Sequence, residues 1–311
     1  MENPLNIAVI GVGAIGGIIT GNLAAAGHRL AVVEVIPGHR QKIAREGIRI
    51  SGIRDFVVRP VSVHESIDAL GNARLDIVVV ALKATVLPAV AGEIAPLGNG
   101  QAPLVCFMNG IDSEQPLLQA AGPERVLRAA VNFGGNLAGD GHIKWAFSNP
   151  PTHLGGYAAS SRDRAKDVAR LFSAAGLGME AVGDIRSYVW RKAIVNAMLA
   201  TAVLTNLNIG EQLDQPDMRR LFLKIIEERI AVAEREKIDL GEGFFEYCVD
   251  FHERARQHIP PSALDIAVGR KTEVDFIEGK VIEYGLKHGV PVPTHETLYA
   301  LVKGKESGLK E

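Results

Sequence analysis

The chain has 311 residues, more than one hydrophobic core usually accommodates, and 47% of them are hydrophobic, so we expect two domains. Its net charge is −2 and its lysines and arginines are scattered, which argues against a nucleic-acid-binding protein and favours a small-molecule partner. The two cysteines, Cys106 and Cys248, stand far apart, and no pair among the nine histidines has convincing zinc spacing. The sequence therefore predicts no metal site and suits a reducing compartment.

A strand, a glycine turn and a helix are predicted at the start of the chain. The apolar run Ile7 to Ile10 is followed by GVGAIG at residues 11–16, and helix-forming residues then continue to Ala26. In such a pattern the first glycine makes the tight turn, the second lets backbone approach a pyrophosphate, and the third lets the helix pack on the strand. The helix N-terminus offers free amides to the anion. We expect a dinucleotide to contact Gly11, Gly13, Ala14, Ile15 and Gly16.

Glu34 ends the next predicted strand, His28 to Val33, and lies 18 residues past Gly16. A carboxylate at this place can accept both ribose hydroxyls of a dinucleotide, and it would repel a 2′-phosphate. The cofactor is therefore expected to be NAD(P)H with a preference for NADH. The basic or titratable residues that could still receive a phosphate nearby are His39, Arg40 and Lys42.

The uncharged stretch from Pro4 to Gly27 has the length of a membrane span. Its glycines and Asn22 argue against that interpretation, and the acidic start Met1-Glu2-Asn3 lacks the basic region of a signal peptide. We expect a cytoplasmic protein.

Short apolar strands alternate with amphipathic helices in the first half, which is typical of a parallel sheet covered on both faces. Predicted strands are Leu5–Gly11, Leu30–Glu34, Leu75–Leu82, Pro103–Met108 and Met179–Val182, with a shorter extended segment at Phe56–Val63 and further strands and turns between Arg125 and Tyr157. Predicted helices are Ala14–Ala26, Arg40–Glu46, Val86–Leu97, Glu114–Ala121 and Ser161–Ala175.

Two polar residues follow predicted strands at the edge where open parallel sheets bind ligands. Lys83 follows Leu75–Leu82, and Asn109 follows Pro103–Met108. Lys83 is either a ligand for a phosphate or ribose or an ordinary surface charge. Asn109, with Gly110, is either a ligand residue or part of a common turn dipeptide.

From Ile185 onward, glycine thins out and long segments with a 3.6-residue period dominate. They predict helices at Ser187–Asn206, Pro216–Lys237, Gly243–Gln257, Ser262–His288 and Thr294–Lys305. The fold class is therefore α/β: a Rossmann-type domain over residues 1–183, followed by an all-helical domain over residues 184–311. Apolar faces such as Leu221 to Ile230 either form a homodimer interface or belong to the core.

Reduction of a carbonyl requires a hydride, a proton donor at the developing alkoxide, and polar groups that hold the substrate. Lys192 and Asn196 are four residues apart and share a helix face with mostly apolar neighbours. Apolar surroundings disfavour the charged form of a lysine and make it a usable general acid. The alternative is a lysine whose stem packs while its amine reaches solvent. Glu273 lies in the predicted helix Ser262–His288 and is either a solvated charge or a substrate ligand.

Six blocks of the chain, in this order, resemble the ketopantoate reductase (2-dehydropantoate 2-reductase) family. They are IAVIGVGAIGG at 7–17, ALKA at 81–84, MNG at 108–110, WRKAIVNA at 190–197, GRKTEVDFIEG at 269–279 and HGVPVPTHETL at 288–298. The resemblance implies a Rossmann domain joined to a helical domain, and reduction of a 2-oxo acid to a D-2-hydroxy acid in pantothenate biosynthesis. It also implies that Lys192 is the general acid, that Asn196 and Glu273 hold the substrate, and that Asn109 orders the nicotinamide side.

The chain departs from the family pattern at three places. Ala200 stands where members that reduce ketopantoate carry a second asparagine, Pro261 takes a serine position with Ser262 displaced by one, and the C-terminal Pro-x-Asn is Pro293-Thr294-His295. Loss of hydrogen-bonding groups weakens discrimination for a polar substituent, so another 2-oxo acid is expected to fit. The alternatives are an NADH-dependent D-2-hydroxyacid dehydrogenase of the same family and a non-catalytic dinucleotide-sensing protein.

Overall fold

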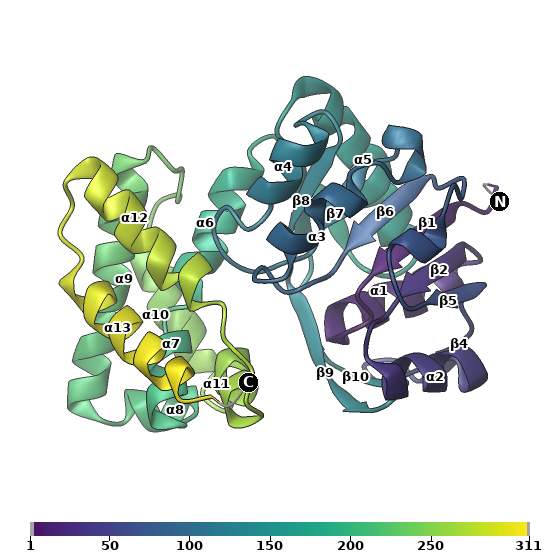
Figure 1. Cartoon of the computed structure of the whole chain (residues 1–311). Helices are drawn as coiled ribbons and strands as arrows, with labels where there is room; N and C mark the ends of the chain where they lie inside the picture. The colour runs from purple at the N-terminus through teal and green to yellow at the C-terminus, as the bar shows by residue number, and fades with distance from the viewer. Residues whose placement is uncertain (1–2, 310–311) are drawn as a thin grey trace. The chain divides into compact units, whose positions relative to one another are not determined.

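The computed structural model describes residues 3–309, and these form two compact units. The first comprises the described residues as far as Asn109 together with Ser113–Ile185. The second comprises Gly110–Asp112 and the described residues from Arg186 onward. In Figure 1 the first unit is coloured purple to teal and the second runs from teal through green to yellow.

The first unit is built on an eight-stranded sheet with the order β12-β11-β8-β7-β6-β1-β2-β5. All neighbouring strands are parallel except β8 and β11, so β11 and β12 run opposite to the others. The bounds are β1 Asn6–Ile10, β2 Arg29–Val33, β5 Ser62–His64, β6 Ile77–Val80, β7 Leu104–Cys106, β8 Val126–Ala130, β11 Thr152–Gly156 and β12 Met179–Ala181.

Helices cover both faces of this sheet, as predicted. Along β1, Ile7 and Val9 point into a core shared with α1 and α5, whereas Ala8 and Ile10 point into a core shared with α3 and α4. The helices are α1 Ala14–Ala25, α2 Pro37–Glu46, α3 Leu87–Ile94, α4 Gln115–Ala121 and α5 Ala159–Ala174, with short 3-10 turns at Asp68–Leu70 and Gly98–Gly100. The alternation of apolar side chains thus produces a two-faced α/β unit.

A second sheet of four strands, order β4-β3-β10-β9, packs on α1 (Figure 1). Its strands are β3 Ile48–Gly52, β4 Phe56–Val58, β9 Phe133–Gly139 and β10 His142–Ser148. A Cβ atom at Gly17 would stand 2.6 Å from Cγ1 of Ile143, and one at Gly21 would stand 2.7 Å from Cγ1 of Ile50. The small residues of α1 therefore serve close packing between helix and sheet.

Several predicted elements of the first unit have other bounds. The segment predicted as one extended stretch, Phe56–Val63, is divided between β4 and β5, which belong to different sheets, and β3 was not predicted. The strands β6 and β7 are shorter than the apolar runs that contain them. The reason is that buried loop residues such as Phe107 and Met108 are as apolar as the strands they follow.

The second unit is helical, as predicted. Its helices are α6 Ile185–Val195, α7 Leu199–Thr205, α8 Ile209–Leu213, α9 Pro216–Arg235, α10 Phe244–Arg254, α11 Pro261–Ala267, η3 Val274–Phe276, α12 Glu278–His288 and α13 Pro293–Ser307. Its core includes Trp190 on α6, Phe222 and Ile226 on α9, and Val281 on α12. Across residues 3–309 no helix combines the length and the apolar character required to cross a membrane.

Two long helices predicted in this unit are interrupted. Ser187–Asn206 is two helices, α6 and α7, separated by a turn at residues 196–198. Ser262–His288 contains α11, a non-helical stretch at 268–273, the 3-10 helix η3 and α12. Gly269, whose φ is +73°, accounts for the second break because it follows α11 in the left-handed region. Glu273 consequently lies just before η3 and outside a helix, contrary to the prediction.

Candidate functional site

The predicted cofactor-binding residues of the first unit follow four neighbouring strands. The glycine turn follows β1, Glu34 follows β2, and Lys83 and Asn109 each stand three residues beyond the ends of β6 and β7. These strands are adjacent and parallel in the order β7-β6-β1-β2, so their carboxyl ends share one edge. Open parallel sheets bind ligands at this edge.

The glycine turn has the shape of a phosphate cradle. Gly11 has a φ of +90°, and a Cβ atom there would stand 2.9 Å from the carbonyl oxygen of Ala81. At Gly16 a Cβ atom would stand 1.9 Å from the carbonyl oxygen of Gly11, so only glycine fits. At Gly13 a Cβ atom would meet no atom of the described residues within 4 Å, which leaves open space beside the first turn of α1. Ala14 and Ile15 form that turn, and their amides have no acceptor within the helix. The arrangement fits a bound anion.

Glu34 is buried beside this turn, with 6% of its surface exposed. Its Oε2 accepts a hydrogen bond of 3.2 Å from Val12 N–H, and its Oε1 accepts one of 2.9 Å from Ile36 N–H. Two backbone donors therefore fix the carboxylate next to the glycine turn. A fixed acceptor at the end of the second strand fits a ribose hydroxyl pair.

The residues near Glu34 that could receive a phosphate have partners of their own. Arg40 donates to the carbonyl oxygens of Glu34 and Val35 and pairs with Glu65 at 3.2 Å, and Lys42 pairs with Glu46 at 2.7 Å.

His39 is 2% exposed and joins two distant segments of the first unit. Its Nδ1 accepts from Gly141 N–H at 2.9 Å. Its Nε2 therefore carries the hydrogen and donates to the carbonyl oxygen of Val12 at 3.0 Å. The glycine turn is thereby connected to the turn between β9 and β10.

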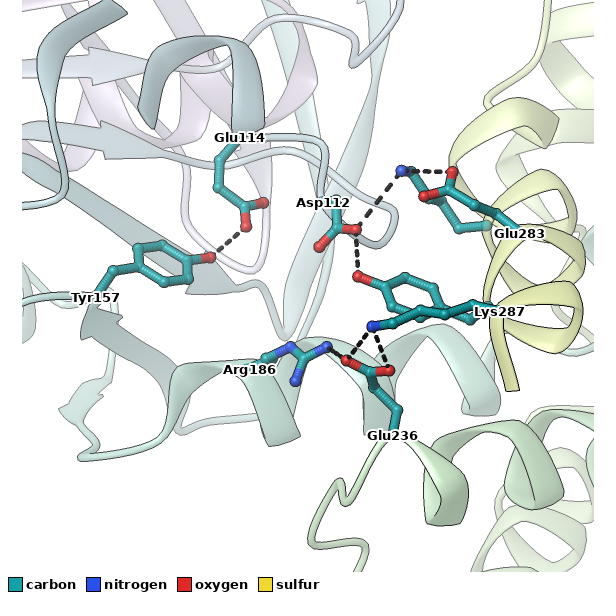
Figure 2. A network of polar contacts seen from close by, with 9 residues as sticks. Asp112, Glu114, Tyr157, Arg186, Glu236, Glu283 and Lys287 are labelled. Carbon is teal, nitrogen blue, oxygen red and sulfur yellow. Dashed lines mark hydrogen bonds and ion pairs between the residues drawn. The ribbon is translucent and has the colours of Figure 1, made fainter. Parts of the chain in front are cut away.

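A buried ion pair that the sequence pattern did not predict lies beside the loop that carries Asn109. Nε of Arg128 on β8 is 3.2 Å from Oε2 of Glu114, and both side chains are nearly fully buried. Tyr157 donates its hydroxyl to Oε1 of Glu114 (Figure 2). Burial and the neighbouring Glu114 carboxylate raise the pKa of Tyr157 well above its ordinary value. The contacts fix the residue before α4, and with it one end of the loop 107–114. One feature of the sequence could have indicated this ion pair: Arg128 stands within the otherwise apolar strand sequence VLRAA.

The predicted catalytic residues lie in the second unit. Lys192 is in the last turn of α6, and Asn196 follows that helix, with Asn196 N–H donating to the Lys192 carbonyl at 3.0 Å. The neighbour of Glu273, Val274, packs in the same core as Ala193 and Ala197. Thr272 is held by two hydrogen bonds of 2.6 Å to Oε1 of Glu306. The structure thus anchors the Glu273 segment on the core that also holds α6.

One of the three positions that depart from the family pattern, Ala200, lines a small cavity of the second unit, together with Ser262, the neighbour of Pro261. Ala200 is 2% exposed, and the remaining lining residues are Leu199, Val203, Thr272, Val274, Ile277, Glu278 and Val302. The lining is mostly apolar.

The side chain of Pro261 lies outside the described part. The side chain of His295 is fully buried, and both ring nitrogens contact Glu228 or Arg229. This position therefore gives no support to the prediction that the chain takes another 2-oxo acid.

A second polar network anchors both segments with which the chain enters the second unit (Figure 2). Tyr284 donates its hydroxyl to Oδ2 of Asp112 at 2.7 Å, and Lys280 lies 3.6 Å from the same oxygen. Arg186, Lys287 and His288 all contact the carboxylate of Glu236. Sequence periodicity did not indicate this network, since its members come from four segments that are far apart in the sequence.

We expect Glu236→Gln to lower the free energy of unfolding by about 2 kcal/mol at pH 7. Burial opposes ionisation of Glu236, but hydrogen bonds from His288, Lys287 and Arg186 outweigh it and lower the pKa to about 2. A lowered pKa means that the stabilisation is complete above the ordinary value of 4.5 and is lost as pH falls toward 2. Urea unfolding at pH 7 and pH 3 measures the effect, because about half or more of the stabilisation should be lost at the lower pH. A difference between wild type and variant that does not shrink at pH 3 would contradict the assignment.

No group of three or more histidine, cysteine, aspartate or glutamate side chains in residues 3–309 is arranged to hold a metal ion. The first unit instead brings the residues predicted to bind a dinucleotide to one edge of its sheet, and the second holds a lysine and an asparagine one turn apart. This fold and these residues are the ones expected of an oxidoreductase.

Comparisons with known proteins identify the family. Residues 7–159 match the family model described as ketopantoate reductase PanE/ApbA, and residues 184–306 match its C-terminal counterpart. The 2-dehydropantoate 2-reductase of Archaeoglobus fulgidus is 28% identical over 306 residues, which cover 97% of this chain and 98% of that protein. The chain therefore belongs to the ketopantoate reductase family, as the resemblance predicted.

Solved structures agree with this assignment. A PanE/ApbA family ketopantoate reductase from Ralstonia eutropha superimposes with a TM-score of 0.88 at 26% identity, covering 99% of this chain and all of that one. A D-mandelate dehydrogenase solved with NADH gives a TM-score of 0.84 at 25% identity, covering 98% of this chain and all of that one. Both likenesses extend over both units.

Proposed function

We propose that this protein reduces a 2-oxo acid to the D-2-hydroxy acid with NADH. The observation that carries the proposal is that the chain has both parts such a reaction needs. Lys192 and Asn196 lie one helical turn apart in the second unit. In the first unit, the glycine turn, Glu34, Lys83 and Asn109 follow adjacent parallel strands at one edge of the sheet. The A. fulgidus relative, a 2-dehydropantoate 2-reductase, supports the reaction class.

Each predicted site residue has a separate role in the proposed reaction. Bound nicotinamide dinucleotide supplies the hydride that reaches C2 of the oxo acid. Lys192 donates a proton to the C2 oxygen as negative charge develops there, and it recovers that proton from solvent. Asn196 and Glu273 hold the substrate, and Asn109 and Lys83 contact the nucleotide side. The net change is one hydride and one proton added across the carbonyl.

NADH is the expected cofactor because of how Glu34 is held. Its buried carboxylate is fixed by Val12 and Ile36, and a 2′-phosphate at this place would meet its negative charge. Arg40 and Lys42, the nearby cations, are already paired with Glu65 and Glu46. The D-mandelate dehydrogenase of similar fold was solved with NADH.

The second candidate is a D-2-hydroxyacid dehydrogenase for an oxo acid other than ketopantoate. Ala200 favours it, because an alanine at a position where members that reduce ketopantoate carry an asparagine gives a substrate hydroxyl one partner fewer. The chemistry of Lys192 is the same for both candidates.

A substrate panel tests both candidates. NADH oxidation is followed with ketopantoate, 2-oxoisovalerate and phenylglyoxylate. We expect turnover of at least one, with kcat/KM for an apolar oxo acid exceeding that for ketopantoate if the second candidate is right. Cofactor binding without turnover of any of them would contradict the proposal and favour a dinucleotide-sensing protein.

A further inference from the structure

A group of four buried or half-buried ionisable residues lies in the core of the second unit. Arg229 on α9 is fully buried, and its Nη2 donates to Oε1 of Glu278 at 2.8 Å. Its Nε donates to Nε2 of His295 at 2.9 Å, and Nδ1 of His295 lies 2.8 Å from Oε2 of Glu228. Charges are rarely buried without a role that compensates for their desolvation.

Hydrogen-bond directions define the state of His295. Because Arg229 can only donate, Nε2 of His295 accepts, and Nδ1 must carry the hydrogen that goes to Glu228. Burial lowers the pKa of His295 to about 4, which agrees with a neutral ring. Glu228 also accepts from the backbone amides of Thr294 and His295 at the start of α13. Arg229 is therefore held rigidly from α12 and α13.

The remaining arm of Arg229 reaches α6. Its Nη1 donates to the carbonyl oxygen of Ala193 at 2.5 Å. In an uninterrupted helix that carbonyl would accept from Ala197 N–H. Within the described chain the backbone ladder runs from Asn196 to Lys192 and is not continued by Ala197. The guanidinium takes the place of that amide and caps the C-terminal end of α6, where a cation is also favoured by the helix dipole.

We propose that Arg229 is a positioning residue that ends α6 after Val195 and thereby sets Asn196 relative to Lys192. This inference rests on the proposed function of these two residues. The capped carbonyl belongs to the residue after Lys192, and the turn that follows begins with Asn196. A small misplacement of groups that act on a bound substrate costs up to about 10² in rate. Lysine at position 229 keeps the positive charge but lacks the planar guanidinium, whose N–H groups donate to three acceptors at once. These acceptors are His295, the Ala193 carbonyl and Glu278.

The test compares Arg229→Lys with Ile225→Ala, a matched control on the same helix whose buried side chain contacts the core of this unit. Both variants are expected to lower Tm, and both are measured well below their Tm, where each is folded. We expect Arg229→Lys to lower kcat on the best oxo acid by about tenfold or more. The Kd of NADH should stay within about twofold, since the dinucleotide edge lies in the first unit. Ile225→Ala should keep kcat within about twofold of wild type.

Hydrogen exchange of the backbone amides in residues 194–199 gives a readout independent of turnover. Arg229→Lys should raise the exchange rate of these amides about tenfold or more, and Ile225→Ala should leave that rate unchanged. Equal kcat in the two variants, or unchanged exchange at 194–199 in Arg229→Lys, would overturn the inference. If the wild type itself reduces no oxo acid, the proposed function fails, whereas the exchange measurement still decides whether Arg229 caps α6.

Discussion

Replacing Lys192 by alanine should lower kcat by about 10² or more while NADH binding stays unchanged. In the proposed mechanism the variant loses its proton donor at the C2 oxygen, so only water could stabilise the negative charge that develops there. The glycine turn and Glu34 belong to the first unit and keep their hydrogen bonds. Steady-state turnover with the best oxo acid, together with a fluorescence titration of NADH, measures both quantities.

Lys224→Ala is the matched control, because Lys224 is an exposed lysine on α9. It should leave kcat and the Kd of NADH as they are. Unchanged turnover in Lys192→Ala would remove the general-acid assignment. A loss of NADH binding in that variant would instead point to damage beyond the reacting group.

The second large effect concerns the choice between NADH and NADPH. We expect wild type to favour NADH in kcat/KM by at least about tenfold, because two like charges about 4 Å apart repel by a few kcal/mol even at an effective dielectric of about 20. Glu34→Gln should raise the NADPH-to-NADH ratio by about tenfold or more. The amide removes the charge yet keeps an oxygen that can accept from Val12 or Ile36.

Glu65→Gln serves as the control, since Glu65 is an exposed carboxylate that pairs with Arg40 near the same strand end. It should change the ratio far less than Glu34→Gln does. A wild-type preference of about tenfold for NADPH would refute the charge argument outright.

Local signals explain what could be predicted from the sequence. The glycine turn, Glu34 and the strand-following Lys83 and Asn109 each depend on neighbours within a few residues, and parallel strands brought them to one edge. The helices α9 and α13 lie close to their predicted bounds. Periodicity reports which face of a helix is buried, and this information is local.

The missed features depend on partners far along the chain. Strand β3 pairs with β10, about ninety residues later, and a short strand has little pattern of its own. At the break between α6 and α7, the carbonyl oxygen of Ala193 accepts a hydrogen bond from Arg229, which is 36 residues further along the chain. The apolar periodicity of the sequence continues through the break and does not reveal it. One signal was present: Arg229 interrupts the buried face that Ile225, Ile226 and Val232 form on α9.

His39 connects the glycine turn, where we propose that the cofactor binds, with a distant hairpin. Its ring holds the Val12 carbonyl at the glycine turn on one side and the Gly141 amide between β9 and β10 on the other. If a dinucleotide binds at the glycine turn as proposed, we expect it to stabilise that hairpin as well, and by thermodynamic reciprocity a frayed hairpin should weaken dinucleotide binding by the same free energy. The stability of the small sheet would then contribute to the affinity for the cofactor.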